Sequence, residues 1–237
     1  MTPPLTAGEL PVGEEKTRRV REMFDTIAPR YEVVNRIVTF GLDGLWRRRA
    51  VRSLGLPPRS LVLDIASGTG DLCIESTRQG LVAVGLDLSY GMLAAGPPDT
   101  PRIQCDAAAL PIPTASADGV VSGYGLRNFT DLQGCLDEMA RVLRPGGRVA
   151  LLEVCEPEGT VYRAGFSLWF NKVVPLIGGI LSDADAYRYL PKSVAYLPDA
   201  AELRAMLVAA GFSGVNRHLL NGGLSQLYTA TRAGGAP

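Results

Sequence analysis

The stretch that decides the fold reads Leu61-Val-Leu-Asp64-Ile-Ala-Ser67-Gly68-Thr69-Gly70-Asp71-Leu72. Its first half is a continuous apolar run, which predicts a parallel strand that is buried on both faces. Its second half is a glycine-rich turn that opens onto a helical pattern. Gly68 and Gly70 permit backbone torsions and a close ligand approach that a Cβ would block, and the helix N-terminus offers free amides. We therefore expect a nucleotide-like ligand at this turn.

The glycine spacing argues against a dinucleotide as that ligand. The full dinucleotide fingerprint needs a third glycine three positions after Gly70, and the chain has Cys73 there. Without that glycine a pyrophosphate packs less well on the helix. An adenosine that carries no phosphate fits the pattern better.

Composition limits the class of protein. A chain of 237 residues with 46% hydrophobic side chains is expected to form one domain. Its 24 basic and 24 acidic residues balance, so the overall positive charge of a nucleic-acid binder is missing. Cys73, Cys105, Cys135 and Cys155 form no C-x-x-C pair, which argues against a zinc site or a disulfide framework and predicts reduced thiols. The sequence shows no signal core and no convincing membrane span, so we expect a cytoplasmic protein.

The chain divides into a tail and one domain. Residues 1–13 are rich in proline and glycine and predict a mobile tail, and residues 14–237 form the domain. Within it, residues 14–55 predict N-terminal helices, the third of which carries Arg47-Arg48-Arg49, either as a solvated face or as a patch for acidic lipid headgroups. Residues 156–198 predict an inserted helical cap. The apolar side chains of this cap either pack on the core or form a groove for an apolar substrate.

Alternating strands and helices predict the sheet. Further strands are expected at 81–87, 103–105, 118–122 and 148–154, and their alternation with helices implies parallel pairing with right-handed crossovers. Residues 213–219 and 224–231 flank Asn221-Gly222-Gly223 and predict an antiparallel hairpin. The fold class is therefore α/β, with a Rossmann-like, seven-stranded, mostly parallel sheet, an antiparallel last strand and helices on both faces. This topology is typical of class I methyltransferases.

Polar residues gather at the carboxyl edge of this sheet, where open α/β folds bind ligands. Asp87 ends the second strand and either accepts the two hydroxyls of a ribose or caps the next helix. Asp106 follows the third strand, and either accepts an adenine amino group or serves as a turn residue. The loop 123–129 follows the fourth strand and is expected to face the same crevice.

Four segments carry a resemblance to a known family. They are Val20-Arg-Glu-Met-Phe-Asp25-Thr-Ile-Ala-Pro29-Arg-Tyr31-Glu-Val-Val-Asn35, Leu63-Asp-Ile-Ala-Ser-Gly-Thr-Gly-Asp-Leu72, Gly125-Leu-Arg-Asn-Phe-Thr-Asp131 and Tyr189-Leu-Pro-Lys-Ser193. In this order and spacing the chain resembles the ubiquinone/menaquinone biosynthesis C-methyltransferase family. The resemblance implies S-adenosylmethionine as cofactor and a reduced, polyprenylated quinol (demethylmenaquinol-like) as substrate.

The resemblance also assigns residues to the cofactor. It transfers the family's contacts onto Thr69, Asp87 and the pair Asp106-Ala107, while a fourth contact, usually a serine, falls on Gly123 and is missing or replaced by Ser122. Together with the glycine turn and the residue after Asp87, the predicted cofactor contacts are Ser67, Gly68, Thr69, Gly70, Asp87, Leu88, Asp106, Ala107, Ser122 and Gly123.

The predicted catalytic residues are Arg127, Asn128 and Tyr31. An arginine is not a base at ordinary pH, but it can stabilise a phenolate or position a water that takes the ring proton. The alternative for Arg127 is a salt bridge that holds its loop, and Tyr31 either contacts substrate or packs between helices. His218, the one histidine, lies in a predicted strand and is an unsuitable base.

Two other functions stay open at this point. A methyltransferase of another small molecule, such as a polyketide or secondary metabolite, would keep the same cofactor site. A non-enzymatic adenosine-binding protein would keep the fold alone. Neither nucleic acid nor metal is expected as a partner. The sequence leaves open a homodimer and a peripheral contact with the inner face of the cell membrane.

Overall fold

The structure is a computed structural model that describes residues 12–155, 174, 189 and 192–234. The predicted tail, except for its last two residues, and most of the predicted cap at 156–198 lie outside the described residues.

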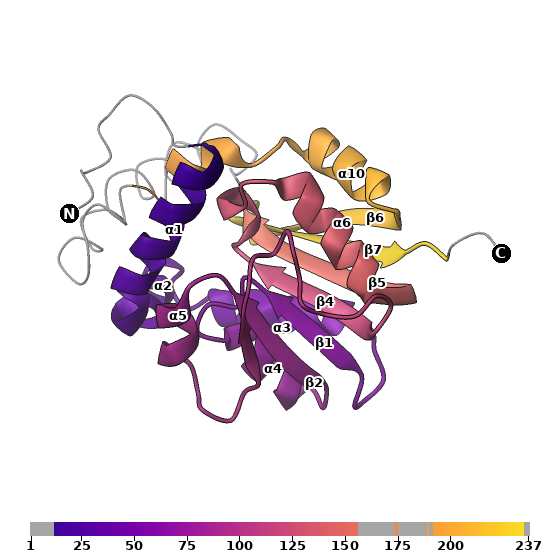
Figure 1. Cartoon of the computed structure of the whole chain (residues 1–237), viewed down its shortest axis with the longest axis horizontal. Coiled ribbons are helices and arrows are strands. Elements are labelled where there is room, and N and C mark those ends of the chain that lie inside the picture. Colours follow the sequence, from indigo (N-terminus) through magenta and orange to yellow (C-terminus); the bar gives the residue numbers. More distant parts are fainter. Residues whose placement is uncertain (1–11, 156–173, 175–188, 190–191, 235–237) are drawn as a thin grey trace.

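The chain begins with helices and continues into alternating strands and helices (Figure 1). Three α-helices and one 3-10 turn precede the sheet: α1 (Gly13–Ile27), η1 (Ala28–Arg30), α2 (Tyr31–Val38) and α3 (Asp43–Ser53). The elements that follow are β1 (Leu61–Ile65), α4 (Asp71–Arg78), β2 (Val82–Asp87), α5 (Tyr90–Ala95), β3 (Arg102–Gln104), β4 (Ala117–Gly123), η2 (Leu126–Asn128), α6 (Leu132–Val142), β5 (Leu143–Val154), η4 (Val194–Tyr196), α10 (Ala200–Ala209), β6 (Phe212–Leu220) and β7 (Ser225–Arg232).

One sheet joins the seven strands of the described residues in the order β3-β2-β1-β4-β5-β7-β6. The pairs from β3 to β5 are parallel, and β7 runs antiparallel to both β5 and β6. The chain order reverses between β1 and β4, which makes their carboxyl ends the expected place for a ligand. The predicted fold, with its reversed last strand and closing hairpin, is confirmed.

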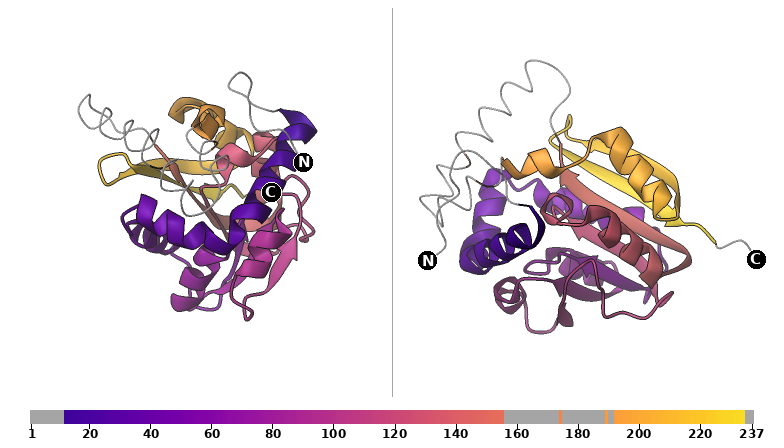
Figure 2. Two further views of the ribbon diagram at one scale, coloured as in Figure 1. Left: turned by 90° about the vertical axis from the view of Figure 1, so that its left-hand side faces the viewer. Right: turned by 45° about the horizontal axis from the view of Figure 1, so that its top comes forward.

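Helices cover both faces of the sheet (Figures 1 and 2). Successive residues of a strand point to opposite faces, so Leu63 and Ile65 of β1 pack with α6 and α10 on one side. Val62, the residue before Leu63, packs with α3 and α4 on the other. Among the described residues, none of the helices has the length and apolar character needed to cross a bilayer.

Two local sequence patterns predict something other than what the structure shows. The apolar spacing of residues 132–143 predicts a helix that runs through Leu143, but Leu143 already pairs with Ala117 and begins β5. Thr130-Asp131-Leu132-Gln133 has the pattern of a capping box, which does not form, because Asp131 is the N-cap and accepts from the Gly134 amide. The Gln133 side chain instead donates to Asp137 and to the Met206 carbonyl.

Candidate active site

A cavity of about 370 Å³ lies at the carboxyl ends of β1, β2 and β4, under α1. Its wall includes the glycine turn, the ends of the strands and one face of α1, with these residues among others: Val20, Phe24, Tyr31, Ala66, Gly68, Asp87, Leu88, Met92, Cys105, Asp106, Ala107, Gly123, Tyr124, Asn128 and Phe129. The volume lies within the range of small-molecule sites. Helix α1 therefore closes a pocket that the sheet edge alone would leave open.

The Asp87 carboxylate joins two segments of this pocket. Its Oδ2 accepts from the Gly68 amide at 2.8 Å and its Oδ1 from the Ser89 amide at 2.8 Å. Ser89, and not Asp87, is the N-cap of α5. Burial raises the pKa of Asp87, and the hydrogen bonds to the two amides oppose that rise. Each carboxylate oxygen retains a lone pair for a ligand hydroxyl, so Asp87 can hold the two segments together and still bind a ligand.

The backbone at the turn is strained where two loops meet. Ala66 has φ of 56° and Tyr124, after β4, has φ of 61°, a region that side chains rarely adopt. A Cβ on Gly125 would lie 2.8 Å from the Ala66 Cβ, so only glycine lets the loops approach this closely. Such strain concentrates at ligand sites, and both strained residues line the cavity.

The predicted cofactor contacts divide into two groups. Six of them line the cavity, namely Gly68, Asp87, Leu88, Asp106, Ala107 and Gly123. The remaining four are buried in the turn or in β4 and are not part of the wall, namely Ser67, Thr69, Gly70 and Ser122. The Asp106 carboxylate also accepts from the Ala108 amide at 2.9 Å, so the turn role and the cavity role coexist.

The position where the family usually has serine is crowded. A Cβ on Gly123 would lie 3.0 Å from the Leu72 Cδ1 atom. The Ser122 side chain is buried and is not part of the cavity wall. Its Oγ has no hydrogen-bond partner among the described residues.

A second cavity, of about 100 Å³, adjoins the first. Tyr31 and Tyr124 line both cavities, so this tyrosine pair forms the boundary between them. The other lining residues come from α2, the α2–α3 turn, α3, η2, the end of β5, the β6–β7 turn and the start of β7: Asn35, Val38, Thr39, Phe40, Asp43, Trp46, Arg47, Arg127, Val154, Leu224 and Ser225. Two reactants held in the two cavities would meet between the tyrosines.

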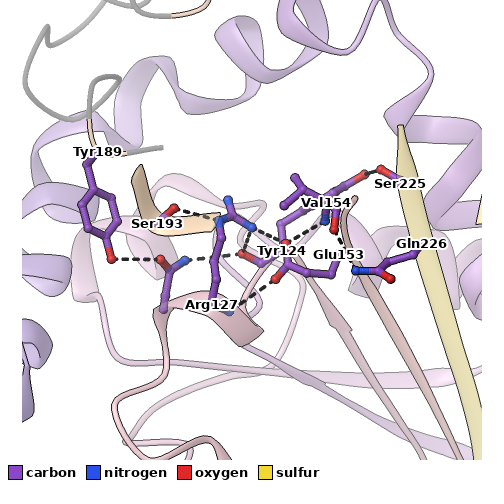
Figure 3. A network of polar contacts seen from close by, with 9 residues as sticks. Tyr124, Arg127, Glu153, Val154, Tyr189, Ser193, Ser225 and Gln226 are labelled. Atoms are coloured by element: carbon purple, nitrogen blue, oxygen red, sulfur yellow. Dashed lines mark hydrogen bonds and ion pairs between the residues drawn. The ribbon is translucent and has the colours of Figure 1, made fainter. Parts of the chain in front are cut away.

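Arg127 and Glu153 form a buried ion pair on one wall of the second cavity (Figure 3). The Arg127 Nη1 also donates to the Tyr124 carbonyl at 2.9 Å, and its Nε donates to the Ser193 hydroxyl at 3.1 Å. The salt bridge that the sequence left open for Arg127 is therefore present. Nη2 has no hydrogen-bond partner among the described residues, so one edge of the guanidinium stays available to a ligand.

The other two predicted catalytic residues, Asn128 and Tyr31, both line the first cavity. The Asn128 amide donates to the Tyr124 carbonyl at 3.4 Å and accepts from the Tyr189 hydroxyl at 3.4 Å. Tyr31 packs edge-on against Phe24, with ring centroids 6.0 Å apart, and still reaches both cavities. The Tyr124 hydroxyl lies 3.0 Å from the Ser225 hydroxyl (Figure 3).

Arg47 corrects one sequence expectation. Its side chain is not on a solvated face: Nη1 lies 2.6 Å from Asp43 Oδ2 and 2.9 Å from Asp71 Oδ2. Arg48 and Arg49 remain exposed, as expected for such a face. The sequence does contain a signal for the Arg47–Asp43 ion pair, because residues four positions apart on a helix are neighbours and Asp43 lies four residues before Arg47.

Sequence reasoning also missed Glu153, Tyr124 and Ser225. Glu153 lies in a strand whose apolar neighbours predict only core packing, and it contacts Arg127 only in the folded structure. No cluster that could hold a metal ion is found among the described residues. None of the four cysteines forms a disulfide within the described residues, and His218 is exposed on the edge strand β6.

The reversed last strand, the glycine turn and the Asp87 pocket define a class I methyltransferase. A family model described as the ubiE/COQ5 methyltransferase family matches residues 12–232, and the chain belongs to that family. It is an enzyme, and S-adenosylmethionine is its methyl donor. The pocket suits this donor, because it offers a buried carboxylate for ribose hydroxyls and apolar walls for an adenine.

Relatives of known name cover almost the whole chain. A ubiquinone/menaquinone biosynthesis C-methyltransferase from Geobacter sulfurreducens is 39% identical over 230 residues, which cover 92% of this chain and 90% of that protein. A demethylmenaquinone methyltransferase from Thermus thermophilus is 40% identical over 221 residues, 89% of this chain and 100% of the relative.

Solved structures share the fold at much lower identity. A methyltransferase from Thermotoga maritima superposes with a TM-score of 0.62 at 18% identity, covering 90% of this chain and 99% of that one. A phosphoethanolamine N-methyltransferase from Haemonchus contortus, solved with S-adenosyl-L-methionine, gives 0.59 at 14% identity over 79% of this chain and 52% of that one. These similarities concern the fold alone.

Proposed function

We propose that the enzyme methylates a ring carbon of a reduced, prenylated quinol of the demethylmenaquinol kind in quinone biosynthesis. The observation that carries the proposal is the pair of adjoining cavities that share Tyr31 and Tyr124. The names of the relatives support the quinol as the acceptor. S-adenosylmethionine supplies a methyl group on a sulfonium, and the larger cavity holds it.

On the donor side, Asp87 accepts the ribose hydroxyls and Asp106 accepts the adenine amino group. Leu88, Ala107 and Met92 supply apolar contacts to the adenine, since all three line the larger cavity. The turn from Ser67 to Gly70 holds the backbone against the donor, and Gly123 leaves space beside it. Ser122 stays a proposed contact that would need a small shift of β4.

On the acceptor side, Arg127 and Asn128 orient one quinol oxygen. The Nη2 of Arg127 donates to this oxygen, which gains negative charge as the methyl group moves to the neighbouring carbon. Tyr31 fixes the quinol ring at the boundary between the cavities. The support for this assignment is that all three line one cavity or both.

The prenyl tail leaves the second cavity along its apolar wall. Val38, Phe40, Trp46, Val154 and Leu224 form that wall, and Phe40 is 69% exposed, so the wall reaches the surface there. The predicted groove in residues 156–198 lies outside the described residues, and its contribution stays a prediction.

A membrane surface is the proposed source of the tail. Val33 and Ile37 on α2 and Phe40 in the turn after it form an exposed apolar stripe, with Arg36 exposed among them. Arginine beside apolar side chains suits the boundary of an anionic bilayer. The enzyme would then be a peripheral protein on the cytoplasmic face of the membrane, and a homodimer on the same stripe is the competing arrangement.

Two measurements test the tail and the membrane contact. Phe40→Ser should raise the Michaelis constant for a two-isoprene quinol several-fold and leave that for a tail-less quinol unchanged, because each buried methylene contributes ~0.8 kcal/mol. Val33→Glu with Ile37→Glu should abolish co-flotation with anionic vesicles. An equal loss on both quinols would contradict the proposed tail path. Unchanged flotation would contradict the proposed membrane contact.

A further inference from the structure

One arginine faces two carboxylates at the second cavity. Asp43 begins α3, where its Oδ1 accepts from the Thr39 hydroxyl at 3.0 Å and its Oδ2 accepts from Arg47 at 2.6 Å. The same Arg47 nitrogen lies 2.9 Å from Asp71 Oδ2. With both carboxylates ionised, this triad carries one negative charge in excess. The triad is largely shielded from water, since Asp43 and Arg47 are 8% and 14% exposed.

The opposite wall of the cavity is balanced. There the positive charge of Arg127 is neutralised by the negative charge of Glu153, so the pair carries no net charge. The ionisable residues among the described residues that line the second cavity are Tyr31, Asp43, Arg47, Tyr124 and Arg127. Asp43 is therefore the single carboxylate among them. Asp71 lies behind Arg47 and does not reach the cavity.

We propose that Asp43 is the proton acceptor of the methylation, a catalytic residue that takes the hydroxyl proton of the quinol. The inference rests on the proposed quinol substrate and deepens it. Arg127 cannot fill this role because a guanidinium stays protonated. His218 is exposed on the edge strand β6 and lines neither cavity.

The proton balance of the step is complete. As the quinol O–H proton passes to the Asp43 carboxylate, the O–H electron pair forms a C=O bond. The adjacent ring carbon then uses its π electrons to bond the methyl group, and the methyl–sulfur pair stays on the sulfur as a thioether. The ring C–H proton next leaves to water, its electrons restore the aromatic ring, and Asp43 returns its proton to the oxygen. One proton is released per turnover.

The charges around Asp43 favour this role. Burial raises the pKa of Asp71, and Glu32 and Asp43 raise it further, while Arg47 and Arg36 lower it. The second carboxylate that contacts Arg47 thus leaves the triad with more negative than positive charge on the side of the cavity where the quinol proton is released. The other groups that face Asp43 are the Thr39 hydroxyl, at the C-cap of α2, and the Tyr31 and Tyr124 hydroxyls, with the Arg127–Glu153 pair across the cavity.

The test varies the acidity of the quinol. Asp43→Asn keeps an acceptor for Thr39 and Arg47 but takes no proton, and it should lower kcat on an unsubstituted tail-less quinol by ~100-fold, within the usual range for a general base. On a quinol made more acidic by a halogen on its distal ring, the loss should shrink to less than about threefold. Below the pKa of the quinol, the rate of Asp43→Asn should rise with pH about tenfold per unit, because only the ionised quinol then reacts. Asp43→Glu should recover part of the rate.

Glu32→Gln is the matched control, because it removes an exposed carboxylate near the triad that does not line the cavity. Its rates should stay within about twofold on both quinols. Calorimetry of S-adenosylmethionine binding and circular dichroism should show that Asp43→Asn is folded and loaded. An equal loss on both quinols, or no loss, overturns the role of Asp43 and leaves the quinol substrate standing. If the unmodified enzyme methylates neither quinol, the proposed function itself fails.

Discussion

The Arg127 guanidinium and the Glu153 carboxylate pair inside the protein, with side chains 5% and 0% exposed. The charge of Arg127 is therefore balanced before any substrate binds, and in the proposed mechanism its part is to direct a hydrogen bond. The pair also ties the loop after β4 to β5, and Ser193 extends this connection to η4 (Figure 3).

Breaking this pair should cost stability. In Glu153→Gln the Arg127 charge stays buried without its counter-charge, so the free energy of unfolding should fall by about 3–5 kcal/mol. Urea denaturation followed by circular dichroism measures it. The control is Glu15→Gln, which removes the exposed pair with Arg19 and should cost no more than about 1 kcal/mol. Equal small losses in both variants would contradict a buried, unscreened pair.

Arg127→Lys should separate catalysis from donor binding. Lysine keeps the charge but not the fork that contacts Tyr124, Ser193 and Glu153 at once, so kcat should fall at least tenfold. The dissociation constant of S-adenosylmethionine should change less than about threefold, because Arg127 does not line the larger cavity. Parallel losses of binding and rate would mean that Arg127 acts only by holding the loop.

Asp87→Ala should weaken binding of S-adenosylmethionine by about ten- to a hundredfold, because hydrogen bonds to a charged group contribute about 1.5–3 kcal/mol. Titration calorimetry measures the constant. Asp25→Ala is the matched control, since Asp25 holds the same end of α5 through Ser89 and Gly91 but does not line the cavity. If both variants bind equally well or equally poorly, Asp87 only anchors the loop.

Asp64 should make stability depend on pH. Burial raises its pKa to about 8, so it is neutral in the folded protein where the unfolded chain has it ionised. The stability that protonation of Asp64 contributes to the folded state is fully present below about pH 4. It is lost as the pH rises towards 8, by about 1.4 kcal/mol of unfolding free energy per pH unit. Relative to the unmodified protein, Asp64→Asn should therefore gain stability between pH 5 and 7, as urea denaturation at several pH values would show.

The control for that measurement is Asp137→Asn, at an exposed position on α6. Its stability relative to the unmodified protein should stay constant across the same range. A flat difference for Asp64→Asn as well would show that Asp64 is ionised in the folded state.

The strands and turns of this fold are easier to predict from the sequence than the pairing of its buried charged side chains. The apolar run before Gly68 and the turn at Asn221 set strand and hairpin through local chemistry, and both predictions are confirmed. The partner of Arg127 was not predictable, because Glu153 lies in an apolar strand and meets it only through β-sheet pairing. The boundary role of Tyr124 depends on a left-handed φ that no local pattern around it indicates.

Methyl transfer to a quinol tests the central claim most directly. The purified enzyme would be incubated with methyl-labelled S-adenosylmethionine and a chemically reduced, two-isoprene demethylnaphthoquinone, and the product analysed by mass spectrometry and NMR. The account predicts one labelled methyl group on the ring carbon next to a hydroxyl, with no transfer to the oxidised quinone. A methyl group on oxygen, or no transfer to the quinol by protein that binds the donor, would contradict it.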